Sequence, residues 1–395
     1  MTTSNCRRKR SENYKKIMNS NRLQPEKQGL NWSDIPRDVV ECILGHLCWA
    51  DRIRMRAVCK AWSFPSRHIP AAAIDKLPWA LKESSLVDDN CRLLDPSSRE
   101  YVMGKFVGGI RVERHVRTIA SDSAYGWVLF QKLYRDFELQ VQPRRIFFLY
   151  SPFTTEIIKL PELKEERLTL RFQLARFSLN ATSPKCVIMV LALDLSSQKI
   201  YVSLCSPGDV SWRTLEFNCV LGSRDLNLIP SGVYANGVFY CIFARGQLGA
   251  FNLQLEEWTI LGGPFASGNC SVHLNLIVID SNVWVFDRAC FQLFRFDFSE
   301  RRWVYVKELK KRALFLGRTS FAVPAVGETS VLANTILSCG PDSPSVRCYG
   351  STCTCVSGTK SPLYRKCVEA TKCAMAWIQI PSAGIWTADD LIKAV

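Results

Sequence analysis

The sequence predicts a mainly β protein, a β-propeller of six or seven blades, with a small helical module in front of it. Two observations predict the propeller. Short apolar strands alternate with turn residues from about residue 80 onward. Tryptophan also returns at Trp212, Trp258 and Trp303, at intervals of 46 and 45 residues, which match the roughly 40–50 residues of a four-stranded blade. An apolar pattern of helical period between residues 31 and 69 predicts the helical module.

The composition favours a folded chain inside the cell. Apolar residues make up 47% of the 395 residues and supply a large core. No apolar run reaches the roughly 18 residues of a membrane helix, so we expect no membrane association. The 17 cysteines follow a polar N-terminal segment without a secretory pattern, so we expect reduced thiols that pack as small apolar groups. We expect the protein in the nucleus, the cytoplasm or both.

Residues 1–30 are strongly basic and lack apolar periodicity. They predict a disordered tail, and the cluster Arg7 to Arg10 leaves open a nuclear-import signal. The formal charge of the whole chain is +15, but charges beyond the tail are mixed in sign, as at residues 164–167. Because no basic stripe is interleaved with aromatic residues, we do not expect nucleic-acid binding.

Residues 31–69 predict three helices, followed by a linker over residues 70–79. Pro36 suits the first turn of the first helix, Asp51 suits the N-cap of the second, and Trp62 falls in a short third helix. Apolar residues spaced by one helical turn give the first helix one apolar face, and they are Ile35, Val39, Val40, Ile43, Leu44 and Leu47.

Residues 80–395 predict the propeller, because each period contains two hairpins. The clearest hairpins fall at residues 147–160, 200–215, 248–261 and 294–306. Asn236-Gly237 is a strong two-residue turn between two further strands, since both residues tolerate positive φ. Strands are expected up to the C-terminus, although the repeat is weakest at residues 80–120 and 326–395. A β-sandwich pair is the structural alternative, and it would not explain the constant tryptophan interval.

Residues 32–62 resemble the F-box. The landmarks of that family fall on Ile35-Pro36, Asp38, Ile43-Leu44, Leu47, Asp51 and Val58-Cys59-Lys60-Ala61-Trp62. The resemblance implies that the module binds a Skp-family adaptor and, through it, the cullin of an SCF (Skp–cullin–F-box) ubiquitin ligase. The candidate adaptor-binding residues are Ile35, Pro36, Ile43, Leu44, Leu47, Val58 and Trp62. For Val58 and Trp62, core packing is the better interpretation.

A second resemblance covers the rest of the chain. Residues 304–317 and 320–323 are similar to the signature of a large plant F-box family whose C-terminal domain is a kelch-like propeller. The resemblance implies a kelch-like β-propeller behind the F-box. The kelch double-glycine pattern is poor, because Gly108-Gly109 and Gly262-Gly263 do not recur in register.

No residue pattern predicts a catalytic, cofactor or metal site. The chain has no Gly-x-Ser-x-Gly, phosphate-loop or His-Glu-x-x-His pattern. Six cysteines lie between residues 339 and 373, but none are spaced as Cys-x-x-Cys, so we expect buried or loop thiols there and no zinc ion.

We therefore expect a non-catalytic adaptor whose propeller binds an unknown target protein. The candidate recognition regions are the loops at residues 222–231, 262–270 and 340–362, near one mouth of the channel. A propeller enzyme or small-molecule sensor is the alternative from another class. An F-box scaffold that acts outside ubiquitin transfer is a third possibility.

Overall fold

The computed structural model describes the N-terminal helices in part and most of the strands. The described residues are 32–47, 51–52, 55, 59, 61–62, 77–82, 92–95, 100–102, 116–134, 144–154, 156–163, 170–194, 196–219, 229, 231–263, 265, 273–339, 344–349, 361–374 and 376–379. The expected basic tail (1–30), most of the expected linker (70–79) and Val58 lie outside them. No described helix is long and apolar enough to cross a membrane.

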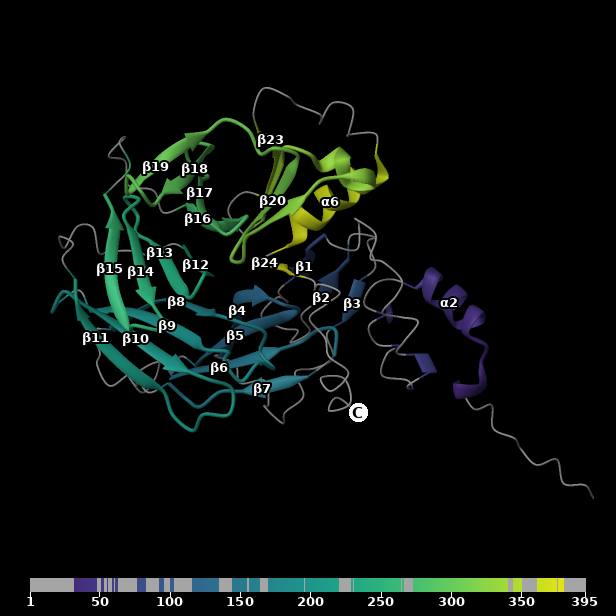
Figure 1. Cartoon of the computed structure of the whole chain (residues 1–395), viewed down its shortest axis with the longest axis horizontal. Helices are drawn as coiled ribbons and strands as arrows, with labels where there is room; N and C mark the ends of the chain where they lie inside the picture. Colours follow the sequence, from purple (N-terminus) through teal and green to yellow (C-terminus); the bar gives the residue numbers. More distant parts are fainter. Residues whose placement is uncertain are drawn as a thin grey trace, which may run out of the picture.

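Six four-stranded sheets, called blades 1 to 6 here, form the propeller within the described residues (Figure 1). This confirms the predicted fold class and sets the number of blades at six. Blade 1 contains β24 (Ala376–Ile378), β1 (Trp79–Lys82), β2 (Arg92–Leu94) and β3 (Glu100–Val102). Blade 2 contains β4 (Val116–Ala124), β5 (Trp127–Tyr134), β6 (Arg144–Tyr150) and β7 (Ile157–Lys159). Blade 3 contains β8 (Leu170–Phe177), β9 (Ile188–Asp194), β10 (Lys199–Cys205) and β11 (Arg213–Asn218).

The other three blades follow in chain order around the ring. Blade 4 contains β12 (Ser231–Ala235), β13 (Val238–Ile242), β14 (Leu248–Asn252) and β15 (Glu257–Gly262). Blade 5 contains β16 (Leu274–Ile279), β17 (Asn282–Asp287), β18 (Gln292–Asp297) and β19 (Arg302–Val306). Blade 6 contains β21 (Phe321–Pro324), β20 (Arg312–Leu316), β22 (Thr335–Ser338) and β23 (Ser345–Cys348).

The hairpins expected from the sequence are present. Strands β14 and β15, and strands β18 and β19, pair in antiparallel register around the turns that were predicted. Asn236 and Gly237 connect β12 to β13 with φ values of +51° and +83°. Positive φ at both central residues is the backbone shape that matches the twist of a tight hairpin.

The ring closes by pairing the two ends of the propeller. Strand β24, from the C-terminal part of the chain, pairs antiparallel with β1, and Trp79 lies opposite Ile378. Figure 1 shows β24 and β1 together beside α6. The C-terminal strand β24 thus completes the first blade, and the closed ring leaves only short sheet edges, which is how propellers limit exposed edges.

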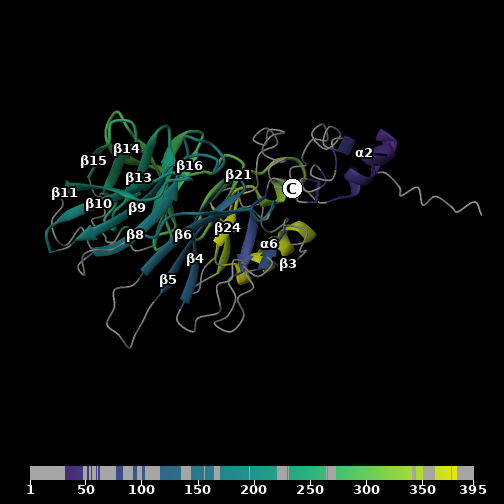
Figure 2. The ribbon, with the colours of Figure 1, turned by 90° about the horizontal axis from the view of Figure 1, so that it is seen from below.

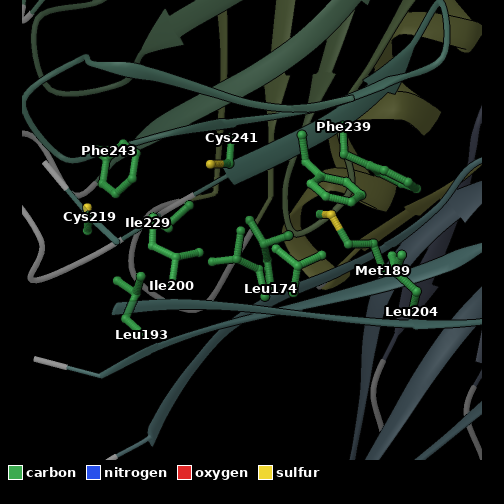
Figure 3. Packing of buried hydrophobic residues seen from close by; sticks show 13 residues of the cluster. Leu174, Met189, Leu193, Ile200, Leu204, Cys219, Ile229, Phe239, Cys241 and Phe243 are labelled. Atoms are coloured by element: carbon green, nitrogen blue, oxygen red, sulfur yellow. The ribbon is translucent and has the colours of Figure 1, made fainter. Parts of the chain in front are cut away.

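Apolar side chains between neighbouring blades form the core. Between blades 3 and 4, Leu174 and Met189 face Phe239 and Cys241, and all four are buried (Figure 3). Burial raises the pKa of the Cys241 thiol well above its ordinary value. This thiol packs as a small apolar group, as the sequence analysis expected.

The expectation of strands up to the C-terminus was wrong next to blade 6. Residues Pro362–Cys373 form a helix, α6, with proline in its first turn. Its Leu363, Cys367 and Ala370 pack on the apolar cluster of blade 6, and this helical spacing was not recognised among the cysteines. Within the blade, β20 pairs parallel with β22, because the 3-10 helix η3 (Gly327–Leu332) carries the chain from β21 to β22.

Candidate functional site

The N-terminal helices form a small apolar core of their own. Val40 and Leu44 of α2 (Arg37–His46) and Trp62 are buried together. Figures 1 and 2 show α2 to one side of the propeller, beyond β3 and α6. The partly buried residues Ile35, Leu47, Met55 and Cys59 pack around this core.

Two polar contacts fix the geometry of this core. The Arg52 guanidinium donates hydrogen bonds to the carbonyl oxygens of Leu44 and Leu47, at 2.8 and 3.0 Å, at the end of α2. The Leu44 carbonyl also accepts the backbone N–H of the C-cap residue Leu47, at 3.2 Å, so the arginine adds donors at a helix end where carbonyl groups lack the usual helical partners. The Trp62 indole N–H donates to the Trp32 carbonyl oxygen at 2.8 Å and ties the third helical segment to η1 (Trp32–Asp34).

An apolar surface remains exposed beside this core. The exposed fractions are 59% for Trp32, 44% for Val39 and 37% for Ile43. Val39 and Ile43 are four residues apart on α2, so their side chains lie on one helix face. We call Val39 and Ile43 the apolar face of the module, while the exposed Trp32 ring packs edge-on against Trp62. Isolated exposed apolar residues are ordinary, but adjacent ones on a small domain indicate a surface that another protein covers.

The structure divides the predicted adaptor-binding residues into three groups. Pro36 and Ile43 are exposed, and Ile35 and Leu47 are partly buried. Leu44 is fully buried, so we assign it to the core of the module in place of a direct contact. Trp62 is also buried in the core, in agreement with the core packing expected for it. Val58 is not described. Val39 and Trp32 were not among the predicted adaptor-binding residues, because their exposure depends on how the helices pack.

In the propeller, most of residues 222–231, 262–270 and 340–362 lie outside the described part of the chain. The inner strands of the blades instead surround a cavity of about 130 Å³, which the sequence analysis did not predict. A buried ion pair lies against this cavity: Arg176 Nε of β8 is 3.9 Å from Asp122 Oδ1 of β4. Burial raises the pKa of Asp122 and lowers the pKa of Arg176, while the attraction between the two charges opposes both shifts.

The Asp122–Arg176 pair connects three blades. Arg176 also donates to the carbonyl oxygens of Gly232, at 2.6 Å, and of Ser121. Asp122 accepts from the backbone N–H groups of Ser123 and Phe177 at 2.9 and 3.0 Å. Both carboxylate oxygens therefore have fixed donors, which is the arrangement of a structural carboxylate and not of a poised general base.

Among the residues that the structure describes, no cluster of three or more His, Cys, Asp or Glu side chains could hold a metal ion. In the cysteine-rich segment, Cys339 and Cys367 are buried. Burial raises the pKa of each of these thiols to about 12, which favours the uncharged form over the thiolate that binds zinc.

A small N-terminal helical module with an exposed apolar face, joined to a propeller, is the architecture of an F-box substrate adaptor, a class of proteins that are in general not catalytic. Residues 32–64 match the F-box domain. The chain belongs to the KIB1-4 beta-propeller family, whose model matches residues 93–359.

Curated relatives are plant F-box proteins from Arabidopsis thaliana. F-box/kelch-repeat protein At1g57790 is 28% identical over 236 residues, which are 59% of this chain and 59% of that protein. F-box protein At3g56470 is 28% identical over 58% of this chain and 56% of that protein. F-box/kelch-repeat protein At3g18720 is 28% identical over 59% of this chain and 57% of that protein. The chain thus spans less than two thirds of the length of these relatives.

Proposed function

We propose that this protein is the substrate-recognition subunit of an SCF-type ubiquitin ligase. The apolar face of the F-box module binds a Skp-family adaptor, and the adaptor connects the chain to a cullin. The observation that carries this proposal is the exposure of Val39 and Ile43 on one face of α2, next to a core that already contains Leu44. Removing these apolar side chains from water stabilises the protein only when a partner covers them, so their burial favours binding.

The size of the module supports this proposal. A module of about 40 residues is too small to bury all of its apolar surface. An amphipathic helix with exposed apolar residues one turn apart is a common element of protein–protein recognition. Ile35, Pro36 and Leu47, which are exposed or partly buried around the apolar face, extend the proposed contact surface.

The propeller binds the target protein in this proposal. The chain itself catalyses no step, since the ligase acts by holding lysines of the target close to a ubiquitin-loaded partner, which raises their effective concentration. The complex operates inside the cell, in the nucleus, the cytoplasm or both, because the adaptor and the cullin act there.

The test is binding of the full chain to a purified Skp-family adaptor. Ile43→Asp places an unpaired charge in the proposed apolar interface, and we expect at least about tenfold weaker binding. Val210→Asp is the matched control, because Val210 is an apolar residue of the propeller with 93% exposure. Unchanged binding by Ile43→Asp would contradict the proposal.

Leu44→Asp is a poor test, although it alters the same helix. Leu44 is fully buried beside Val40 and Trp62, so a charge there unfolds the module and abolishes binding for any surface that the module uses. Ile43→Asp leaves this core intact. Circular dichroism and thermal unfolding of each variant verify that the fold is retained.

A further inference from the structure

A groove lies between the connection from blade 5 to blade 6 and the 3-10 helix η3. One side is formed by Glu308, Lys310 and Lys311, and the other by residues between 325 and 334. Its volume is about 900 Å³, within the range of roughly 300–1,000 Å³ that ligand sites usually have. A backbone hydrogen bond joins the two sides, because the N–H of Ala325 donates to the carbonyl oxygen of Lys311 at 2.9 Å. The groove is therefore part of the folded blade.

Apolar side chains line the η3 side of the groove. They belong to Ala325, Val326, Val331 and Ala333, and the exposed fraction of Val326 is 53%. The buried Thr329 hydroxyl accepts the backbone N–H of Val326 at 3.1 Å and donates to its carbonyl oxygen at 2.8 Å. Because both backbone groups of Val326 are paired in this way, the residue offers only its apolar side chain to a ligand. An exposed valine in a concave apolar lining indicates a surface that a partner covers.

The opposite side of the groove carries two lysines without a counter-charge. Lys310 and Lys311 are exposed, and neither side chain forms an ion pair within the described part of the chain. The neighbouring Arg312, in contrast, pairs with Asp280 at 2.6 Å. Glu308 is the carboxylate among the described lining residues, so the charge of this lining is still positive. Ammonium groups at the rim of an apolar groove favour a partner that carries carboxylates.

The backbone at these lysines is unfavourable for lysine. The φ values are +47° at Lys310 and +58° at Lys311, in the left-handed region that Asn and Gly adopt at lower cost. Two successive residues of this shape are typical of tight turns that prefer Asn-Gly, as at Asn236-Gly237 of this chain. A binding role for the two charges accounts for residue types that the fold alone does not favour.

We propose that this groove binds a short segment of the target protein in which an apolar side chain is flanked by aspartate or glutamate. The apolar side chain packs on Val326 and Val331, and the carboxylates pair with Lys310 and Lys311. This inference rests on the proposed function, because it names the surface by which the propeller recognises its target. The adaptor binds the helical module instead, so separate assays test the two assignments.

Selection of peptides on the purified full chain is the first experiment. Random short peptides displayed on phage are selected on wild-type protein, and fluorescence anisotropy measures the affinity of the enriched peptides. We expect the enriched sequences to share an apolar residue with Asp or Glu beside it. Val326→Glu should weaken their binding at least about tenfold, because it places a carboxylate in the apolar lining next to those of the peptide. Leu255→Glu is the matched control, since Leu255 is an apolar residue between β14 and β15 with 62% exposure.

Replacement of the two lysines separates binding from folding. Lys310→Asn combined with Lys311→Gly removes both charges and supplies the residues that this backbone shape prefers. We expect about tenfold weaker peptide binding together with a Tm that is unchanged or higher, so that unfolding does not explain the lost affinity. Lys185→Gln, at an exposed position outside the groove, should leave peptide binding unchanged.

Several results would overturn the inference. They are the absence of enriched peptides, enriched peptides that lack acidic residues, and affinities that Val326→Glu or the lysine replacement leaves unchanged. A dimer of the full chain that Val326→Glu dissociates, as measured by sedimentation, would also overturn it, because a second copy would then fill the groove. Adaptor binding is measured on the same samples and should be intact in Val326→Glu. Wild-type protein that binds the peptides but no adaptor would refute the proposed function instead.

Discussion

The indole N–H of Trp303 donates a hydrogen bond to the carbonyl oxygen of Gly246, 57 residues earlier, at 2.7 Å. Trp212 makes a similar contact with the carbonyl oxygen of Pro161 in the segment after blade 2, also at 2.7 Å. Both tryptophans therefore connect their own blade to the preceding part of the ring. Trp258 differs, because its buried indole nitrogen has no hydrogen-bond partner among the described residues.

The three tryptophans should therefore respond differently to phenylalanine. Trp212→Phe and Trp303→Phe each remove an indole and a hydrogen bond and leave a carbonyl without its donor. Trp258→Phe removes a similar volume and no hydrogen bond. We expect the first two variants to lose about 1–2 kcal/mol more free energy of unfolding than the third. Chemical denaturation of the full chain checks this order, and equal losses for all three would contradict it.

The same tryptophans show how far the sequence predicts the fold. Their interval predicted the blades, and local signals such as Asn236-Gly237 predicted individual hairpins correctly. The pairing of β24 with β1 was not predicted, since no local pattern reports a partner strand about 300 residues away. Helix α6 was missed because a short apolar segment with several cysteines has similar strand and helix patterns.

The F-box module shows a similar limit. The spacing of apolar residues in α2 predicted that one helix face is apolar. It did not separate the residues buried in the core of the module from those exposed for contact with a partner. That separation depends on Trp62, which belongs to another segment and packs against Val40 and Leu44 on one side of α2. Leu44 consequently lies in the core, while its neighbour Ile43 is exposed.

Gly232 lies on β12, where neighbouring atoms leave no room for a larger side chain. A Cβ atom at Gly232 would lie 2.9 Å from Leu174 Cδ2 and 3.0 Å from the Tyr240 carbonyl oxygen. Gly232→Ala should destabilise the protein by about 1–3 kcal/mol, because the backbone carbonyl has little freedom to move. Gly263→Ala is the control, with no atom within 4 Å of its added Cβ. Thermal unfolding that is equally affected in both variants would contradict the packing argument.

Asp194 at the end of β9 predicts a pH dependence of stability. Its carboxylate accepts hydrogen bonds from the Ser196 hydroxyl at 2.6 Å and the Ser196 backbone N–H at 2.9 Å. These donors, the hydroxyl first, hold the pKa of Asp194 well below its ordinary value. A pKa that is lower in the folded state stabilises the protein above the unfolded value of about 3.9, and this contribution is lost as the pH falls further.

We therefore expect wild-type protein to exceed Asp194→Asn in unfolding free energy by about 1–2 kcal/mol at pH 7. The difference should shrink by about 1 kcal/mol on going to pH 3. Denaturant titrations at the two pH values measure it. Ser196→Ala removes the principal donor, so it should reduce the same pH dependence. A difference between wild type and Asp194→Asn that is constant with pH would refute this assignment.

Thr319 forms hydrogen bonds with β24, the strand that closes the ring. Ring closure can therefore be tested by replacing this one hydroxyl group with a methyl group. Its hydroxyl accepts the backbone N–H of Trp377 at 2.9 Å and donates to the carbonyl oxygen of the same residue. Thr319→Val keeps the side-chain shape but leaves the buried N–H and carbonyl groups of Trp377 without the hydroxyl, which should lower the free energy of unfolding by about 2–4 kcal/mol.

Because β24 has only three residues, the loss should appear as faster amide hydrogen exchange at residues 376–378 and at β1, ahead of global unfolding. Thr259→Val, at an exposed position of β15, should leave exchange at β24 unchanged. If Thr319→Val instead lowered protection uniformly in all six blades, ring closure would not be a separate unit of stability.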